Sequence, residues 1–523
     1  MFRKSAFVVL ALASLISVFC VGEEGKYGGT LRVATVTPLP SIDWQNSTAD
    51  ACQQVMWHVY EGLVEYNSEF VPSPMLAQSW ESNEDFTRWT FHLRQGVMFH
   101  NGDVMDAWDV KASIERFQRG YVGDRLKGIT VNVLDSYTVE FVLEEPNTVL
   151  PGILANFHAH PCIMPKEIAE TVPPGELKPP DVVGTGPYRL VEWKPGVRLV
   201  LERFENYTPN TNYTGWDGVA GYKIPYIERI EFYPVSEPTV RVAGLLAGEY
   251  DFICDIPGLE YQRLKDDPNI VTLRQGGSYP CVLLNVNNPP LDNLLVRRAI
   301  QVGIDIEEIG LAASQGVRDL FALDGHLMTM VIKRWYWDGW KDLGLYNQAD
   351  TERARSLLEE AGYAGEEIVF LTNHSSAIHF RSSVAMLEQL KNLGLNVIME
   401  VYDWPGSLAK RGDLTAWHLF QTGMGFMTEP TNYDMIWSGH RPSHCSQWWG
   451  DEEVYRYWCD ALKTADFEEQ YQLYEKLWER VYYLAPFVKL QEVFTVYAHT
   501  KDLKDYRTIG MIAFWNAWLE DRS

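Results

Sequence analysis

Many side chains in this chain could take part in chemistry, but they form no familiar catalytic motif. The sequence contains no Gly-x-Ser-x-Gly elbow, no His-Glu-x-x-His pair and no phosphate loop ending in Gly-Lys-Ser or Gly-Lys-Thr. Gly423-Met424-Gly425 lacks a third glycine. The 70 acidic residues leave room for a carboxylate pair suited to glycoside hydrolysis, so a secreted glycoside hydrolase is the enzymatic alternative.

A metal site has one weak indication. His440, His444 and Cys445 lie close together in the sequence, and imidazole and thiolate are common metal ligands. The three residues do not have the spacing of a known metal motif. We therefore expect neither a bound metal nor another cofactor.

The cysteines leave two interpretations open. Past the first 22 residues their number is even, and an exported protein can form disulfides. Cys445 and Cys459 are close enough in the chain to join a loop to the next helix, but buried free thiols fit the pattern equally well. The six are Cys52, Cys162, Cys254, Cys281, Cys445 and Cys459.

Length and charge limit the classes of protein that fit. A chain of 523 residues exceeds what one hydrophobic core usually serves, so two or three domains are expected. The net charge of -25 disfavours nucleic acid and anionic membrane surfaces as partners. Most of the 19 Trp and 27 Tyr are expected in cores, which leaves a few for a ligand cleft.

The local patterns predict alternating strands and helices. Residues 87–94 alternate as a strand, residues 96–103 form a turn-rich loop, and residues 106–117 place apolar side chains on one helical face. Further on, residues 367–372 and 395–401 read as strands on either side of a helix at 381–393 that Gly394 stops.

A later helix is predicted at residues 466–481. Its apolar stripe predicts a core-facing helix. The stripe consists of Phe467, Tyr471, Tyr474, Trp478 and Val481.

The order of residues, beyond these elements, resembles one known family. The stretch LAQSWESNEDFTRWTFHLRQGVMFHNGDVMDAWDVKASIERF at residues 76–117 is similar to the signature of the family 5 solute-binding proteins, which feed ABC importers. Similar segments follow the family order along nearly the whole chain. They are residues 28–33, 41–43, 183–188, 202–207, 240–252, 296–305 and 351–363.

The resemblance implies an α/β fold of two lobes joined by a hinge, with an extra inserted subdomain, the large cluster C type of periplasmic binding protein. Lobe I is then discontinuous, and the inserted subdomain interrupts it. The expected segments are 23–62, 184–274 and 490–523 for lobe I, 63–183 for the inserted subdomain, and 275–489 for lobe II.

The first 22 residues read as a signal peptide. Arg3 and Lys4 precede an apolar run at residues 6–21 that is short for a membrane span, and cleavage after Gly22 would start the mature chain at Glu23. The alternative is a lipid anchor on Cys20, which the bulky Phe19 before it disfavours. The protein is thus expected in the periplasm or at the cell surface.

The resemblance also indicates where a ligand would bind. In the family the cleft face of lobe II contributes aromatic and hydrogen-bonding groups, and Trp404 is the aromatic residue most expected to contact ligand. Peptide-binding members have an Asp where this chain has Phe426, and some have an Arg near Asn373. The candidate ligand-binding residues are Asn373, His374, Trp404, Phe426, Glu429, Asn432, Tyr433 and Trp437.

Without those two charged anchors, a neutral ligand fits better than a free peptide, because an unpaired buried ammonium is costly. Oligosaccharide and peptide-like solutes therefore both stay open, with sugar slightly ahead. We expect an exported, monomeric binding protein that closes over a small molecule, delivers it to a membrane permease and performs no chemistry.

Overall fold

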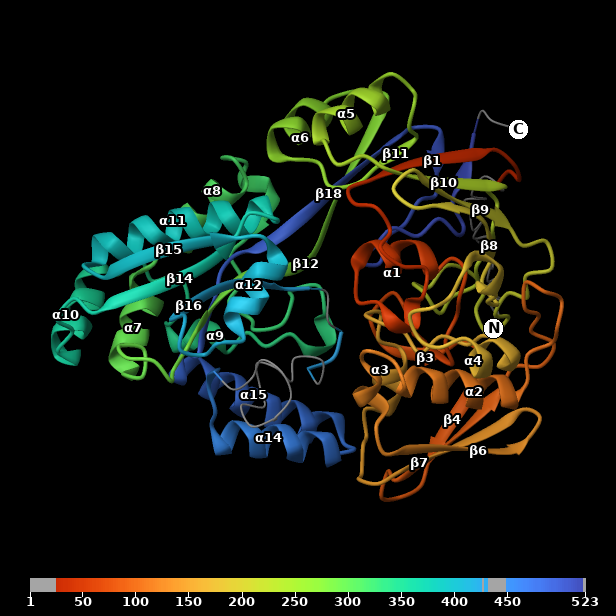
Figure 1. The fold of residues 1–523 in the computed structure, drawn as a ribbon, viewed down its shortest axis with the longest axis horizontal. Helices are drawn as coiled ribbons and strands as arrows, with labels where there is room; N and C mark the ends of the chain where they lie inside the picture. Colours follow the sequence, from red (N-terminus) through yellow and green to blue (C-terminus); the bar gives the residue numbers. More distant parts are fainter. Residues whose placement is uncertain (1–24, 426–427, 431–447, 521–523) are drawn as a thin grey trace, which may run out of the picture.

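The computed structural model describes residues 25–425, 428–430 and 448–520. Two α/β lobes lie side by side, and the long strands β12 (Ile270–Leu284) and β18 (Glu492–Thr500) run between them (Figure 1). This is the two-lobed architecture that the sequence predicts.

In the described part of the chain, a 12-stranded sheet passes through both lobes. From the edge of lobe II to the edge of lobe I its order is β15 (Asn396–Tyr402), β14 (Glu367–Asn373), β16 (Leu419–Met424), β12, β18, β11 (Phe252–Ile253), β1 (Thr30–Thr35), β10 (Arg229–Pro234), β9 (Arg198–Arg203) and β8 (Tyr188–Lys194). Two short strands join this sheet outside that order. Strand β13 (Phe321–Ala322) pairs with β18, and β17 (Phe487–Lys489) pairs with β12.

Strand β12 changes its main partner partway along its length. Its first half, up to Ser278, pairs with β18, and from Tyr279 it pairs with β16 and β17. The register shifts between Gln275 and Ser278, where Gly277 has a φ of +129°. Such a bulge bends a strand, so this point is the natural hinge between the two lobes.

A second sheet lies within the segment expected as the inserted subdomain. It has the order β4 (Ala77–Ser82), β5 (Arg88–Leu93), β7 (Thr138–Leu143) and β6 (Ile129–Asp135). Helix α2 (Ala107–Gln118) packs against it. The helix begins where the sequence predicts, because Asp106 accepts hydrogen bonds from the backbone N–H of Trp108 and Asp109.

The remaining short strands pair as β2 (Val64–Tyr66) with β3 (Pro72–Pro74) and β19 (Leu503–Lys504) with β20 (Trp518–Leu519). The other described helices are α1 (Asp50–Met56), α3 (Leu150–Leu154), α4 (Lys166–Thr171), α5 (Pro238–Leu246), α6 (Gly258–Leu264), α7 (Leu294–Gly303), α8 (Ile306–Ala313), α9 (Trp340–Leu343), α10 (Thr351–Ala361), α11 (Ala377–Leu393), α12 (Trp404–Arg411), α14 (Glu452–Lys463) and α15 (Phe467–Leu484).

The predicted β-α-β unit of lobe II is present as β14, α11 and β15. The two strands are parallel, and Gly394 ends α11 in a left-handed conformation with φ of +100°. Helix α11 begins earlier than predicted because Ser376 caps it by accepting a hydrogen bond from the N–H of His379.

Helix α15 corrects one prediction. Tyr474, Trp478 and Val481 are buried as expected, but Phe467 is 37% exposed. Phe467 stands in the first turn, where its ring contacts Trp335, at 4.9 Å between ring centroids, and Arg334 but stays partly open to solvent.

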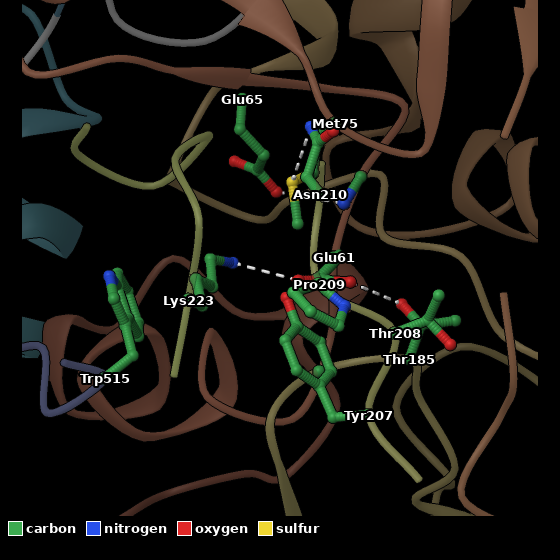
Figure 2. A network of polar contacts seen from close by, with 12 residues as sticks. Glu61, Glu65, Met75, Thr185, Tyr207, Thr208, Pro209, Asn210, Lys223 and Trp515 are labelled. Carbon is green, nitrogen blue, oxygen red and sulfur yellow. Dashed lines mark hydrogen bonds and ion pairs between the residues drawn. The ribbon is translucent and has the colours of Figure 1, made fainter. Parts of the chain in front are cut away.

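A buried polar network joins the segments of lobe I (Figure 2). One carboxylate oxygen of Glu61 accepts hydrogen bonds from Lys223 at 3.0 Å and Tyr207 at 2.8 Å, and the other accepts one from Thr185 at 3.1 Å. The Lys223 ammonium also lies 4.8 Å from the centre of the Trp515 ring. Glu61 and Thr185 flank the segment 63–183, so this network joins the two ends of the expected inserted subdomain, whose boundaries stay a prediction.

Candidate functional site

A cavity of about 490 Å³ touches both lobes and lies over the strands β12 and β18 that run between them. Volumes of about 300 to 1,000 Å³ are typical of small-molecule sites. Lobe I contributes the ends of β1 and β11 and helix α1, lobe II contributes the start of α11 and the end of β16, and β12 and β18 form the floor.

The position of the cavity follows from the direction of the strands. In lobe I, β11 runs parallel to β1, and the residues after both strands line the cavity. In lobe II, β14 runs parallel to β16, and Ser376 and Gly425, which follow these strands, line the opposite wall. Ligands of open α/β sheets bind at the carboxyl ends of parallel strands, so both lobes direct their binding edge to the same space.

Carboxylates give the cavity its charge. Asp50 on α1 and Asp255 after β11 line it, and no Lys or Arg is found among the described lining residues. The two lining histidines are neutral near pH 7, because burial lowers the pKa of His158 and lowers that of His379 to about 4. The cavity is therefore acidic, and it offers hydrogen-bonding groups from Gln54, Gln275, Ser278, Tyr279, Thr495 and Tyr497.

On the side away from the hinge, the inserted subdomain touches lobe II. Thr148 donates from its backbone N–H and its hydroxyl to the carbonyl oxygen of Leu462, at 3.0 and 3.1 Å. The Gln470 amide donates to the Thr148 hydroxyl at 3.4 Å. These hydrogen bonds connect the two lobes at a second place, apart from the strands β12 and β18.

Glu429 belongs to this second contact between the lobes. It is 3% exposed and accepts a hydrogen bond from the Trp335 indole at 2.8 Å, with the Arg334 guanidinium 4.0 Å away. A Cβ placed on Gly152 of α3 would lie 2.9 Å from its Cγ, so a larger residue there would force the Glu429 side chain to shift. Burial raises the pKa of Glu429 to about 7.

The structure brings three of the sequence candidates together beside the cavity. Asn373 ends β14, is 1% exposed and accepts a hydrogen bond from the N–H of Ser376. His374 is exposed, and its N–H donates to Tyr402. Trp404 starts α12, and its ring packs on Phe420 with 6.4 Å between centroids.

None of the four described candidates, Asn373, His374, Trp404 and Glu429, lines the cavity. The nearby wall consists of Ser376, Ile378 and His379. Their role as ligand contacts stays a prediction. Phe426, Asn432, Tyr433 and Trp437 lie outside the described residues.

Sequence reasoning missed Asp50 and Asp255. Asp255 directly follows β11, and the rule that strand ends carry ligand sites could have indicated it. The strand order was needed, however, to know that β11 lies beside β1 and that both end at the cleft.

The five described cysteines are free thiols, namely Cys52, Cys162, Cys254, Cys281 and Cys459. Burial raises the pKa of Cys52 and Cys254 to about 12, which makes them unreactive. Within the described ranges, no group of three or more His, Cys, Asp or Glu side chains is arranged to hold a metal. His440, His444 and Cys445 lie outside those ranges.

Comparison with known proteins fits this geometry. The family model described as bacterial extracellular solute-binding proteins, family 5 middle, matches residues 71–443. The chain belongs to this family. A probable peptide ABC transporter periplasmic-binding protein of Sinorhizobium fredii is 28% identical to this family 5 protein over 513 residues, covering 93% of each chain.

Solved structures share the fold. The binding protein AgaA from A. tumefaciens R10, in complex with agropinic acid, superimposes with a TM-score of 0.78 at 23% identity, covering 95% of this chain and 99% of its own. DppA from Helicobacter pylori, in complex with the peptide STSA, has a TM-score of 0.77 at 23% identity and the same coverage. In the described part of this family 5 protein, no helix has the length and apolar character needed to cross a membrane.

Proposed function

We propose that this family 5 protein is the exported binding component of an ABC importer that captures a peptide or peptide-like solute between its lobes. It then presents the solute to a membrane permease. The observation that carries the proposal is the cavity of about 490 Å³ that both lobes and the hinge strands enclose. Closing two lobes over a ligand is a hinge transition, and it requires no chemical step.

The charges in the cleft favour a peptide over an oligosaccharide as the ligand. The sequence favours a neutral ligand, since the family's Asp position carries Phe426. The cavity nevertheless contains two carboxylates from other elements, Asp50 and Asp255, which can meet the ammonium group of a peptide. The name of the Sinorhizobium fredii relative supports the same class.

The binding test uses the purified mature protein and a panel of di- to pentapeptides with maltotriose as the sugar probe. We expect micromolar or tighter binding of peptides, measured by calorimetry, and a smaller radius of gyration on binding, measured by small-angle scattering. The ligand should be recovered chemically unchanged. Binding of maltotriose without any peptide would contradict the peptide proposal, and release of hydrolysis products would establish the glycoside hydrolase alternative.

Export and processing form a separate part of the proposal. We propose cleavage after Gly22 and a soluble, monomeric mature protein, with the lipid anchor on Cys20 as the alternative. Mass spectrometry of the N-terminal peptide distinguishes the two. A start at Glu23 supports cleavage, whereas a lipid-modified Cys20 would contradict it.

A further inference from the structure

Asp255 has an unusual backbone at the edge of the cavity. It directly follows β11, lines the cavity and has a φ of +50°, in the left-handed region. Residues with a Cβ seldom adopt this conformation, and where they do, the surroundings must hold them in it.

Arg241 of α5 stabilises this turn through hydrogen bonds to its backbone. Its side chain is buried and donates hydrogen bonds to the carbonyl oxygens of both Cys254, at 3.0 Å, and Asp255, at 2.7 Å. Its Nη1 group donates to the carbonyl oxygens of Val235 and Ser236. All four hydrogen bonds of Arg241 therefore go to backbone oxygens, and they position the Asp255 turn without engaging its carboxylate.

The carboxylate of Asp255 has no hydrogen bond or ion pair with another described side chain. The side chain is exposed toward the cavity, where desolvation by the surrounding protein raises its pKa and the positive charges of Arg241 and Arg381 offset part of the rise. Asp50, the other lining carboxylate, is also exposed, at 76%, but it has His158 as a neighbour at 3.9 Å.

We propose that Asp255 is the specificity-determining residue of the cleft and binds the ammonium group of a peptide from the lobe I side. This inference rests on the proposed function and names the group that the site selects. An unpaired carboxylate enclosed by closing lobes is unfavourable, whereas an ammonium group restores its pairing.

The test compares trialanine with N-acetyl-trialanine, which differ in the charge of the amino terminus. Calorimetry should show that the unmodified protein binds trialanine about ten- to hundredfold more tightly, the range expected for a hydrogen bond to a charged group. Asp255→Asn should bind both peptides equally. Asn tolerates the left-handed conformation, so this variant should keep the turn, and a thermal melt checks that it folds.

The matched control is Glu84→Gln, which removes the same charge from an exposed position in the turn between β4 and β5. It should keep the preference for the free amino terminus. If Asp255→Asn keeps that preference, or if Asp50→Asn alone abolishes it, the assignment to Asp255 is overturned while the peptide function stands. If the unmodified protein binds no peptide of the panel, the proposed function fails and this inference fails with it.

Discussion

Lys223 and Glu61 form an ion pair across 3.0 Å, and both side chains are fully buried. The two residues are 162 positions apart in the chain, and they join the segment that leads into the inserted subdomain to one that follows it. The Trp515 ring next to Lys223 brings the C-terminal segment to the same point. The three segments expected to form lobe I therefore meet at one buried cluster of Glu61, Lys223 and Trp515.

We expect Lys223→Met to lower the free energy of unfolding by about 3 to 5 kcal/mol, because it leaves the Glu61 carboxylate buried without its counter-charge. The double variant Glu61→Gln with Lys223→Met should recover part of this loss. Urea unfolding measures both. The control is Lys194→Met, since this lysine is 61% exposed and pairs only at the surface, where the expected cost is about 0 to 1 kcal/mol. Equal losses at the two lysines would contradict the role given to the cluster.

A second prediction concerns the bulge of β12 at Gly277. Gly277 has a φ of +129°, which a residue with a Cβ adopts only under strain. Gly277→Ala should therefore cost about 1 to 3 kcal/mol and change the balance of open and closed lobes. Thermal melts and small-angle scattering measure the two effects. Gly215→Ala is the control, because an added Cβ there has no atom within 4 Å. The hinge assignment is wrong if scattering shows the same lobe arrangement in both variants.

The sequence predicted local elements better than the binding site. Periodicity and capping residues predict β5, α2, β14 and α15 closely, because the side-chain pattern along each segment and, for the helices, local hydrogen bonds and caps favour these elements. Which strand ends meet at the cleft depends on pairing across the chain. Pairs such as β1 with β11 and β12 with β18 join residues about 220 positions apart, and no local pattern records them.

The ligand contact of Trp404 stays a prediction of the family resemblance. In the structure Trp404 starts α12, and its ring lies next to that of Phe420 on β16. We expect Trp404→Ala to lower stability by about 2 kcal/mol with and without ligand, through lost packing. Peptide affinity should be unchanged in calorimetry. A loss of affinity at unchanged melting temperature would instead favour ligand stacking.

The last prediction concerns pH and the contact between the lobes at Glu429. Burial raises its pKa from 4.5 to about 7 in the folded protein. Between these two pH values the folded state keeps a proton that the unfolded state releases. The stability contributed by this proton is fully present below about pH 4.5 and is lost as the pH rises to about 7. At about 1.4 kcal/mol per pH unit, the free energy of unfolding falls by about 3 kcal/mol over this range.

Glu429→Gln removes the titration and keeps an oxygen that can accept the hydrogen bond from Trp335. The difference in free energy of unfolding between this variant and the unmodified protein should therefore grow in favour of the variant by about 3 kcal/mol from pH 4.5 to pH 7. Urea unfolding at several pH values measures it. Glu84→Gln, at an exposed position, should show no such trend. A difference for Glu429→Gln that stays constant with pH would mean that this carboxylate is not buried between the closed lobes in solution.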